Sequence, residues 1–288
     1  MKEKSLFQCP VCTNAGIDTN ALYREEKRYY CEKGHSFDRA GKGYVNLLLP
    51  SHTGKGKPGD SKDMLQSRRA FLNKGYYEKF SDRLNELVGQ MITTDKKKQD
   101  SLLDAGCGEG YYLARLRHKL VETCTGSNFR FYGTDVSKTA INYASGRDRG
   151  IYFAVGSSYH LPILEGAMDF VLCVFAPRDE REFRRVLKPG GRLIVAAPGE
   201  RHLYSLRREL YENPELIGER GTVKEGFILL DQVQVEYELY LKSGQDISDL
   251  LKMTPYSQHI TGEAVEDLKN LEKFTTEVEI KVMVYQKL

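Results

Sequence analysis

The chain has 288 residues, of which 40% are hydrophobic and 29% are charged, and its mean hydropathy is −0.50. Burying this much apolar surface offsets chain entropy, so the composition indicates a globular protein and excludes a disordered one. The longest apolar runs, 170–177 and 193–198, fall far short of the roughly 18 to 20 residues that a membrane-spanning helix needs. The N-terminus lacks the apolar segment of a secretory signal, so we expect a cytoplasmic protein without a membrane partner.

The charge is distributed unevenly along the chain. Residues 1–98 contain 19 Lys and Arg against 12 Asp and Glu, a net charge of +7. Residues 99–288 contain 24 against 28, a net charge of −4. A basic N-terminal third is typical of a segment that binds a polyanion. A solvated surface with a chance asymmetry explains the same numbers, and charge alone does not separate the two interpretations.

Two close pairs of metal-ligating residues occur near the N-terminus. Cys9 and Cys12 form a C-x2-C pair, and Cys31 and His35 form a C-x3-H pair after 18 intervening residues. Two tight turns joined by a β-hairpin would hold these side chains around a tetrahedral zinc ion, and 21–30 has the alternating pattern of such a hairpin. The alternative is two unrelated pairs in a reduced protein. We predict a structural zinc site with these four ligands.

Two further changes of pattern divide the chain. A basic, glycine-rich stretch at 51–60 has the composition of a flexible linker. Apolar residues then recur at helical spacing from 61 to 91. The predicted parts are a zinc-binding β domain over 1–48, a basic linker and helical connector over 49–98, and a larger domain over 99–288.

From residue 101 the pattern alternates between strand, turn and helix. The predicted strands are 102–103, 129–135, 151–155, 170–175 and 192–197, and the predicted helices are 111–120, 137–144 and 179–187. Strand patterns return in the tail at 227–230, 233–240 and 278–285. Such alternation predicts an α/β fold, in which helices cover both faces of a mainly parallel sheet.

A glycine-rich turn follows the first of these strands. It reads Asp-Ala-Gly-Cys-Gly-Glu-Gly from Asp104, with Gly106, Gly108 and Gly110, and Asp135 ends the next strand. Tyr111 stands where a dinucleotide-binding fingerprint would need its third glycine, and no phosphate-binding G-K-[ST] motif follows. Asp104 can pair with an α-ammonium group, while Asp135 can accept hydrogen bonds from ribose hydroxyls. A cofactor with both groups is S-adenosylmethionine, and the turn resembles the first motif of class I methyltransferases.

The residues after the fourth strand restrict the methyl acceptor. This segment reads Cys-Val-Phe-Ala-Pro over 173–177 and lacks the [DNS]-P-P-[YF] motif of enzymes that methylate exocyclic amines. The sequence also has no Pro-Cys pair, which usually carries the nucleophile for methylation at C5 of pyrimidines. Ring nitrogens, oxygens, small molecules and proteins remain. Asp179 and Glu180 follow the segment, and a helix N-terminus explains them as well as a catalytic role does.

Motifs along nearly the whole chain resemble those of the bacterial 23S rRNA (guanine-N1)-methyltransferases. They are the two zinc-ligand pairs with Phe37-Asp38, Gly43 to Leu47, Pro58-Gly-Asp60, Arg68 to Leu72, Gly75-Tyr-Tyr77, Asp104 to Tyr112, Asp135 to Lys138, Ala176-Pro177, Pro198 to Leu203 and Met253-Thr-Pro255. The resemblance implies a Rossmann-like class I fold with a mainly parallel seven-stranded sheet. It also implies S-adenosylmethionine as cofactor, a zinc finger that recognises an rRNA hairpin loop at a guanosine of the 745 or 748 type, and a homodimer.

The resemblance further implies cofactor contacts at Tyr77, Gly108, Glu109 and His202. It names no proton acceptor for guanine N1. Tyrosines and cations interleave in 23–30, which suits stacking and clamping of unpaired bases, although the same tyrosines could form a small core around zinc. Two other functions stay open from the sequence: a zinc-containing RNA-binding protein with a non-catalytic methyltransferase fold, and a small-molecule methyltransferase.

Overall fold

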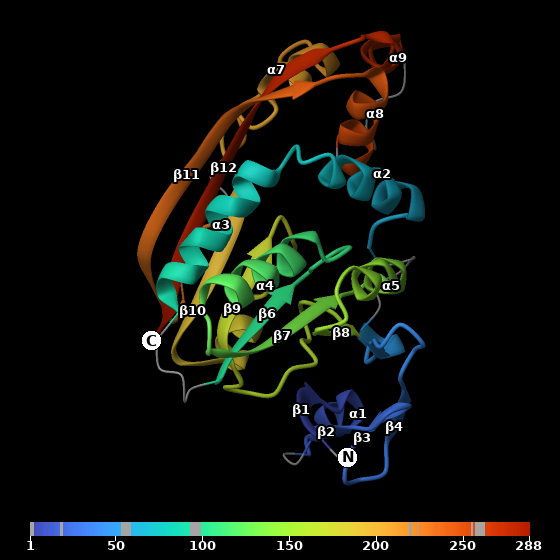
Figure 1. Cartoon of the computed structure of the whole chain (residues 1–288), viewed down its shortest axis with the longest axis vertical. Coiled ribbons are helices and arrows are strands. Elements are labelled where there is room, and N and C mark those ends of the chain that lie inside the picture. The colour runs from blue at the N-terminus through green and yellow to red at the C-terminus, as the bar shows by residue number, and fades with distance from the viewer. Residues whose placement is uncertain are drawn as a thin grey trace.

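The computed structural model describes residues 3–17, 20–52, 59–92, 99–218, 221–223, 225–254, 256 and 263–288 (Figure 1). Most of the linker that the sequence predicts over 51–60 lies outside these described residues. The described part after residue 48 begins with a short 3-10 helix, η1 (Pro50–His52). None of the described helices is long and apolar enough to cross a bilayer.

The N-terminal segment folds into a four-stranded antiparallel sheet with the order β1-β2-β3-β4. Its elements are β1 (Glu3–Gln8), α1 (Pro10–Asn14), β2 (Ala21–Arg24), β3 (Arg28–Tyr30) and β4 (Ser36–Asp38). The hairpin predicted at 21–30 is therefore confirmed. Tyr29 is 1% exposed and packs edge-on against Phe7, so this tyrosine belongs to the core. Tyr23 and Tyr30 lie side by side and remain half-exposed.

Two helices, α2 (Lys62–Asn73) and α3 (Glu78–Met91), form the connector for which the sequence predicts helical spacing. Ser61 caps α2 by accepting a hydrogen bond from the N–H of Met64 at 3.2 Å. The helices are separated at Gly75, which has a left-handed φ of +80° and donates its N–H to the carbonyl of Leu72. The apolar periodicity runs through both helices and does not reveal this break.

A mixed sheet of eight strands, in the order β11-β12-β10-β9-β6-β7-β8-β5, forms the body of the molecule (Figure 1). The strands are β5 (Val45–Asn46), β6 (Gln99–Ala105), β7 (Asn128–Asp135), β8 (Ile151–Val155), β9 (Met168–Val174), β10 (Leu187–Pro198), β11 (Phe227–Leu241) and β12 (Phe274–Lys287). β12 pairs in antiparallel fashion with both β10 and β11, and the other neighbouring strands of this sheet are parallel. The mainly parallel seven-stranded sheet is thus confirmed, and β5 adds an eighth strand because Val45 pairs with Ala154 of β8.

Residues on the central strands alternate between two buried cores, one on each face of the sheet. Leu102 faces a core that contains residues of α3 (Glu78–Met91), α4 (Tyr111–Thr123) and α5 (Lys138–Arg147). Leu103 faces a second core formed with α6 (Glu180–Val186) and with the N-terminal sheet. The N-terminal sheet therefore covers part of the second face.

Direct contacts fix the N-terminal sheet to this second face. The ring of Phe7 packs edge-on against Tyr132 of β7, with ring centroids 5.1 Å apart. The N–H of Gln8 donates to the carbonyl of Pro162 at 3.1 Å, and the N–H of Leu164 donates to the carbonyl of Leu6 at 2.9 Å. These contacts place the N-terminal sheet against β7 and the segment that follows β8.

The C-terminal third extends the sheet and adds three helices beyond it, α7 (Tyr204–Leu210), α8 (Gly244–Met253) and α9 (Glu263–Asn270). Figure 1 shows the long strands β11 and β12 reaching past the body, with α8 lying over α2. Lys74, directly after α2, pairs with the buried Asp246 of α8 at 2.5 Å. This contact ties the connector helix to the C-terminal region.

Candidate active site and zinc centre

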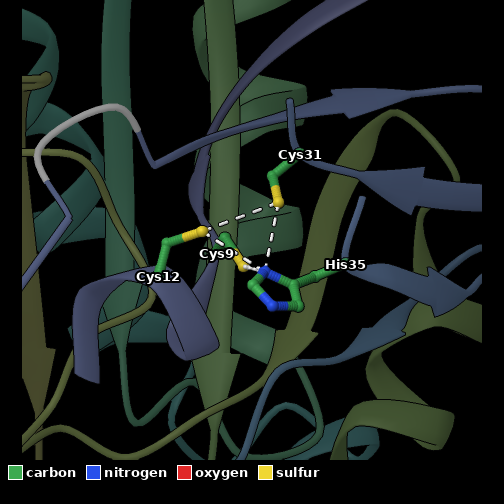
Figure 2. A group of neighbouring side chains, drawn as sticks. All are labelled: Cys9, Cys12, Cys31 and His35. Atoms are coloured by element: carbon green, nitrogen blue, oxygen red, sulfur yellow. Dashed lines mark hydrogen bonds between the residues drawn. The ribbon is translucent and has the colours of Figure 1, made fainter. Parts of the chain in front are cut away.

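The four predicted zinc ligands converge on one point beside the N-terminal sheet (Figure 2). Cys9 stands immediately before α1 and Cys12 lies within it, where a proline at the first helical position fixes the start of the helix. Cys31 and His35 flank a tight turn after β3. In this turn Gly34 adopts a φ of +87° and donates its N–H to the carbonyl of Cys31 at 3.0 Å. The turn therefore brings His35 back to the three cysteines.

Distances between the ligand atoms match a tetrahedral zinc site. Nδ1 of His35 lies 3.5, 3.3 and 3.4 Å from Sγ of Cys9, Cys12 and Cys31, and Sγ of Cys12 lies 3.6 Å from Sγ of Cys31. Zinc bonds of about 2.0 to 2.3 Å at tetrahedral angles place neighbouring ligand atoms about 3.3 to 3.8 Å apart. All three cysteines are buried and free of disulfides. Four protein ligands complete the coordination of zinc, which is the arrangement of a structural site.

The glycine-rich turn at 104–110, the cofactor turn, connects β6 to α4 at the carboxyl end of the parallel strands. The N–H of Gly106 bonds to the carbonyl of Thr134 at 2.8 Å, which attaches the turn to β7. A Cβ added at Gly106 would lie 2.4 Å from Cβ of Ala176, and one added at Gly110 would lie 2.9 Å from Cβ of Ala144. Both glycines are therefore required by the packing of the turn against its neighbours.

Gly108 lies in a more open place. Its φ is +55°, and among the described residues only Nη1 of Arg68, at 3.7 Å, lies within 4 Å of an added Cβ. Main chain that is open to close approach is what a bound cofactor requires. Arg68 reaches over this turn from α2, pairs with Asp60, and donates from Nη2 to the carbonyl of Met253 at 3.4 Å. Sequence reasoning placed Arg68 in a motif but gave it no role at the site.

Asp104 is buried at the end of β6 and its carboxylate lacks a partner on one side. The residue is 1% exposed, and Oδ1 makes no hydrogen bond among the described residues. Burial, together with the nearby Asp135, raises the pKa of the Asp104 carboxyl to about 7. An unpaired buried polar atom costs roughly 1 to 3 kcal/mol, and an ammonium group would satisfy it and favour the ionised form. The residue therefore fits the α-ammonium group of S-adenosylmethionine.

Asp135 holds the turn in place at the end of β7. Its Oδ2 accepts a hydrogen bond from the N–H of Gly108 at 3.0 Å, and its Oδ1 accepts one from the N–H of Ser137 at 2.8 Å. Burial raises the pKa of this carboxyl. Each carboxylate oxygen keeps a further lone pair, so these two bonds are compatible with the ribose hydroxyls that the sequence analysis expects here.

Glu109 is fully buried within an ion-pair network. Its Oε2 lies 2.5 Å from Nη2 of Arg147 and 3.7 Å from Nη1 of Arg69, so the carboxylate joins the turn to α5 and α2. Oε1 makes no hydrogen bond among the described residues. The carbonyl of Glu109 also accepts a hydrogen bond from Nε of Arg147 at 3.4 Å, so Oε1 is the side-chain atom left without a partner for the cofactor contact that the family resemblance implies.

Tyr77 and His202, for which the family resemblance implies cofactor contacts, lie in contact with each other. Oη of Tyr77 lies 3.3 Å from Nε2 of His202, and both residues are buried. Nδ1 of His202 accepts a hydrogen bond from the N–H of Glu279 at 3.2 Å. Burial and the charge of Arg207 lower the pKa of His202 to about 4, so the ring is neutral. Because Nδ1 is an acceptor, the proton is on Nε2, which donates to Tyr77.

Phe175, which the sequence analysis did not single out, completes this aromatic group. It directly follows β9, has a left-handed φ of +53°, and is 39% exposed. Its ring stacks on His202 with centroids 6.2 Å apart and lies 6.4 Å from the ring of Tyr77. A non-glycine residue in this conformation is strained, and such strain clusters at functional sites. The signal in the sequence is its place directly after the fourth strand.

Asp179 has a local structural role. Its Oδ1 accepts hydrogen bonds from the N–H groups of Arg181 and Glu182 at 2.9 and 3.4 Å, which caps α6. The side-chain hydrogen bond from Arg181 lowers the pKa of Asp179. Of the two interpretations that the sequence left open for this residue, the helix N-terminus is confirmed.

Comparison with known families assigns both parts of the chain. Residues 7–57 match the model of the RlmA N-terminal zinc ribbon, and residues 96–254, more than half of the chain, match that of a methyltransferase domain. The methyltransferase match implies S-adenosylmethionine as the cofactor, and the ribbon match agrees with the cluster of three cysteines and one histidine.

Three curated relatives carry related names. The 23S rRNA (guanine(748)-N(1))-methyltransferase of Streptomyces fradiae is 34% identical over 69% of this chain and 66% of its own length. A protein of Micromonospora griseorubida, provisionally named a 23S rRNA (guanine-N(1)-)-methyltransferase, is 34% identical over 69% of this chain and 68% of its own. YxjB of Bacillus subtilis (strain 168), with the same provisional name, is 29% identical over 98% of each chain. The chain therefore belongs to the family of 23S rRNA (guanine-N1)-methyltransferases, which use S-adenosylmethionine and carry a structural zinc ribbon.

Proposed function

We propose that this protein transfers a methyl group from S-adenosylmethionine to N1 of a guanine in a hairpin loop of 23S rRNA, at a nucleotide of the 745 or 748 type. The observation that carries the proposal is that one chain joins a zinc ribbon to a cofactor turn that begins at Asp104, whose Oδ1 has no partner among the described residues. The substrate names of the relatives and the basic N-terminal third support the RNA substrate.

The residues of the turn account for how the cofactor would be held. Asp104 would take the α-ammonium group, Asp135 the ribose hydroxyls, and the open main chain at Gly108 would lie against the cofactor. S-adenosylmethionine supplies an electrophilic methyl group on a sulfonium centre. The contribution of the protein is to fix the donor and the acceptor in near-attack geometry, which removes most of the entropic cost of the encounter.

The target guanine must leave its loop to reach the carboxyl ends of the strands. Phe175 presents a partly exposed aromatic face there, beside Tyr77 and His202, on which a planar base could stack. N1 carries a proton at neutral pH, which must be lost before or during attack. Asp179 caps α6 and His202 is neutral with a pKa of about 4, so neither is assigned as the proton acceptor.

The direct test measures transfer of a labelled methyl group to protein-free 23S rRNA from a strain that lacks the enzyme. Incorporation is expected in wild-type RNA, and it should be lost when the target guanine is replaced by adenine while a guanine elsewhere in the hairpin is kept. No incorporation at low salt, together with labelling of a metabolite fraction, would favour a small-molecule methyltransferase. Calorimetry that detects no binding of S-adenosylmethionine would favour the non-catalytic RNA-binding alternative.

A homodimer, which the family resemblance implies, is part of this proposal. Light scattering coupled to size-exclusion chromatography should then give about twice the chain mass of 32.9 kDa. A mass of one chain at micromolar concentration would contradict the homodimer but would leave the proposed reaction unaffected.

A further inference from the structure

A groove of about 420 Å³ lies where the N-terminal sheet meets the body of the molecule. The turn between β2 and β3 and the segment 39–43 form one side. The segment 148–152, between α5 and β8, forms the other. The groove therefore joins surfaces of the two matched family regions and is separate from the cofactor turn.

Cations dominate this groove. They are Arg24, Lys27, Arg39, Lys42 and Arg149. Glu26 and Asp148 are the acids, and Asp148 is already paired with Arg117 at 2.9 Å. Arg24 pairs with Glu3 at 3.2 Å, whereas the other four cations form no ion pair among the described residues. The groove thus has a surplus of positive charge that the protein itself does not neutralise.

Neutral carbonyl groups hold two of these cations in place. Arg39 is half-buried and donates from Nε to the carbonyl of Gly43 and from Nη1 to the carbonyl of Glu26, both at 3.1 Å. Nζ of Lys42 donates to the carbonyl of Asn142 on α5 at 3.2 Å. Carbonyl partners fix the position of a cation but leave its net charge, so the side chains are ordered for an anionic ligand. A planar guanidinium in particular matches a phosphate group.

The position of the groove excludes a role in holding the reacting base. Ile151, at the start of β8, lines the groove, whereas Val155, at its end, pairs with Asp135 beside the cofactor turn. Four residue steps of about 3.3 Å separate the two ends by about 13 Å. A ligand in the groove therefore lies a nucleotide or more away from the methyl donor.

We propose that this groove binds the phosphodiester backbone of the RNA substrate, at a distance from the loop that carries the target base. The inference rests on the proposed function, since it assumes that the substrate is an RNA hairpin. The groove then supplies affinity and orientation, and the reacting base is bound elsewhere on the same RNA. Substitutions in it should raise KM for RNA and leave kcat and cofactor binding unchanged.

The test uses a triple variant of the full chain, Lys27→Gln, Lys42→Gln and Arg149→Gln, because all three side chains are exposed and form no ion pair among the described residues. The matched control removes the same charge outside the ribbon and the groove with Lys119→Gln, Lys242→Gln and Lys273→Gln, which are also exposed. Binding of the 23S rRNA hairpin is measured against salt concentration for both variants. Calorimetry with S-adenosylmethionine and thermal unfolding check that each variant is folded.

The association constant K falls with salt concentration, and each lost phosphate contact makes the slope of log K against log salt less steep by about 0.7 to 0.9. The slope should therefore become less steep by about 2 to 3 in the groove variant and by about 0 in the control. KM for RNA should rise at least tenfold in the groove variant alone. Equal slopes and equal KM values in the two variants would overturn the inference. Groove-dependent binding of inorganic phosphate with an unchanged RNA slope would also overturn it and would reassign the groove to free phosphate.

The outcomes also separate this inference from the proposed function. If the wild-type protein methylates the hairpin and the two variants behave alike, the groove inference fails and the proposed function stands. If the wild-type protein binds the hairpin through the groove without methylating it, the groove inference stands and the proposed function fails.

Discussion

Asp104 and His202 are both buried near the carboxyl ends of the strands, and burial moves each toward its neutral form. The pKa of Asp104 is raised to about 7, and that of His202 is lowered to about 4. The difference between them is that His202 has partners for both ring nitrogens, whereas Oδ1 of Asp104 has none among the described residues. At the scale of single residues, Asp104 is therefore the group that a cationic ligand would complete.

Asp104→Asn should weaken binding of S-adenosylmethionine at least tenfold at pH 8, because the amide cannot neutralise an ammonium group. In the wild-type protein the affinity should rise with pH up to about 7, by as much as tenfold per unit, since the carboxyl must ionise to pair with the ligand. The variant should lose this dependence. Calorimetric titrations from pH 6 to 8 measure both effects, and an unchanged affinity in the variant would exclude Asp104 from the cofactor site.

Thermal unfolding of the cofactor-free protein is the control for this variant. The unfolded Asp104 carboxyl ionises near 3.9, whereas the folded one keeps its proton to about 7. The protonated Asp104 carboxyl therefore makes its full contribution to the free energy of unfolding below about pH 4, and this contribution is lost as the pH rises to about 7. Asp104→Asn should remove that part of the pH dependence without unfolding the protein.

Two substitutions at His202 separate its structural role from its contact with Tyr77. His202→Ala leaves the N–H of Glu279 without its acceptor and should lower the free energy of unfolding by about 1 to 3 kcal/mol. His202→Asn offers an oxygen near the position of Nδ1 and should lose less. Both should weaken cofactor binding, since neither donates to Tyr77 as Nε2 does. Urea unfolding and calorimetry check this, and equal stability losses would contradict the assigned tautomer.

At the scale of elements, the glycine-rich turn combines two different requirements. Gly106 and Gly110 are needed because neighbouring alanines leave no space for a Cβ, whereas a Cβ at Gly108 would approach only Arg68 among the described residues. The sequence predicted the turn because its residues are consecutive, but it could not assign these separate reasons. Each reason depends on a side chain that the fold brings from another element.

Gly106→Ala and Gly108→Ala should therefore fail in different ways. Both place a side chain at a left-handed φ, which costs about 1 to 2 kcal/mol. Gly106→Ala adds a clash with Ala176 and should cost a further 1 to 3 kcal/mol of stability. Gly108→Ala should lose cofactor affinity more than stability. Thermal unfolding and cofactor titration of both variants measure this, and a Gly108→Ala protein with normal affinity would contradict the open approach proposed there.

The same contrast explains which parts of the site the sequence predicts. The zinc ligands and the acids at strand ends lie within short, local motifs, and the structure brings the zinc ligands together. The pairing of Glu109 with Arg147 joins residues 38 positions apart, and the bond from Lys42 to Asn142 spans 100 positions. Val45 likewise pairs with Ala154, which local periodicity could not reveal. Such contacts depend on the topology of the whole chain, and the groove is formed by them.

At the scale of the whole molecule, the zinc ribbon covers part of one face of the methyltransferase sheet. Its residues Phe7 and Cys9 share a buried core with Val171 and Leu193 of the central strands. The cofactor turn lies at the carboxyl ends of the strands and is built from β6, β7 and α4, with no contribution from zinc ligands. RNA recognition and cofactor binding should therefore respond differently to loss of the metal.

Cys9→Ser should release zinc, because three remaining ligands leave the tetrahedral site incomplete. Methylation of RNA should fall at least tenfold, while the affinity for S-adenosylmethionine changes by less than a factor of three. Zinc content by mass spectrometry, methyl incorporation and calorimetry give the three values. Full methylation activity in a zinc-free protein would show that the ribbon has no part in RNA recognition.

The central claim is methylation of a single guanine at N1 in the 23S rRNA hairpin. Mass-spectrometric mapping of that hairpin, isolated from cells with and without the gene, tests it most directly. The account predicts that one nuclease fragment, containing the 745- or 748-type guanosine, is heavier by one methyl group only when the gene is present, and that its fragmentation places the methyl group at N1. Identical fragment masses in the two strains would contradict the account.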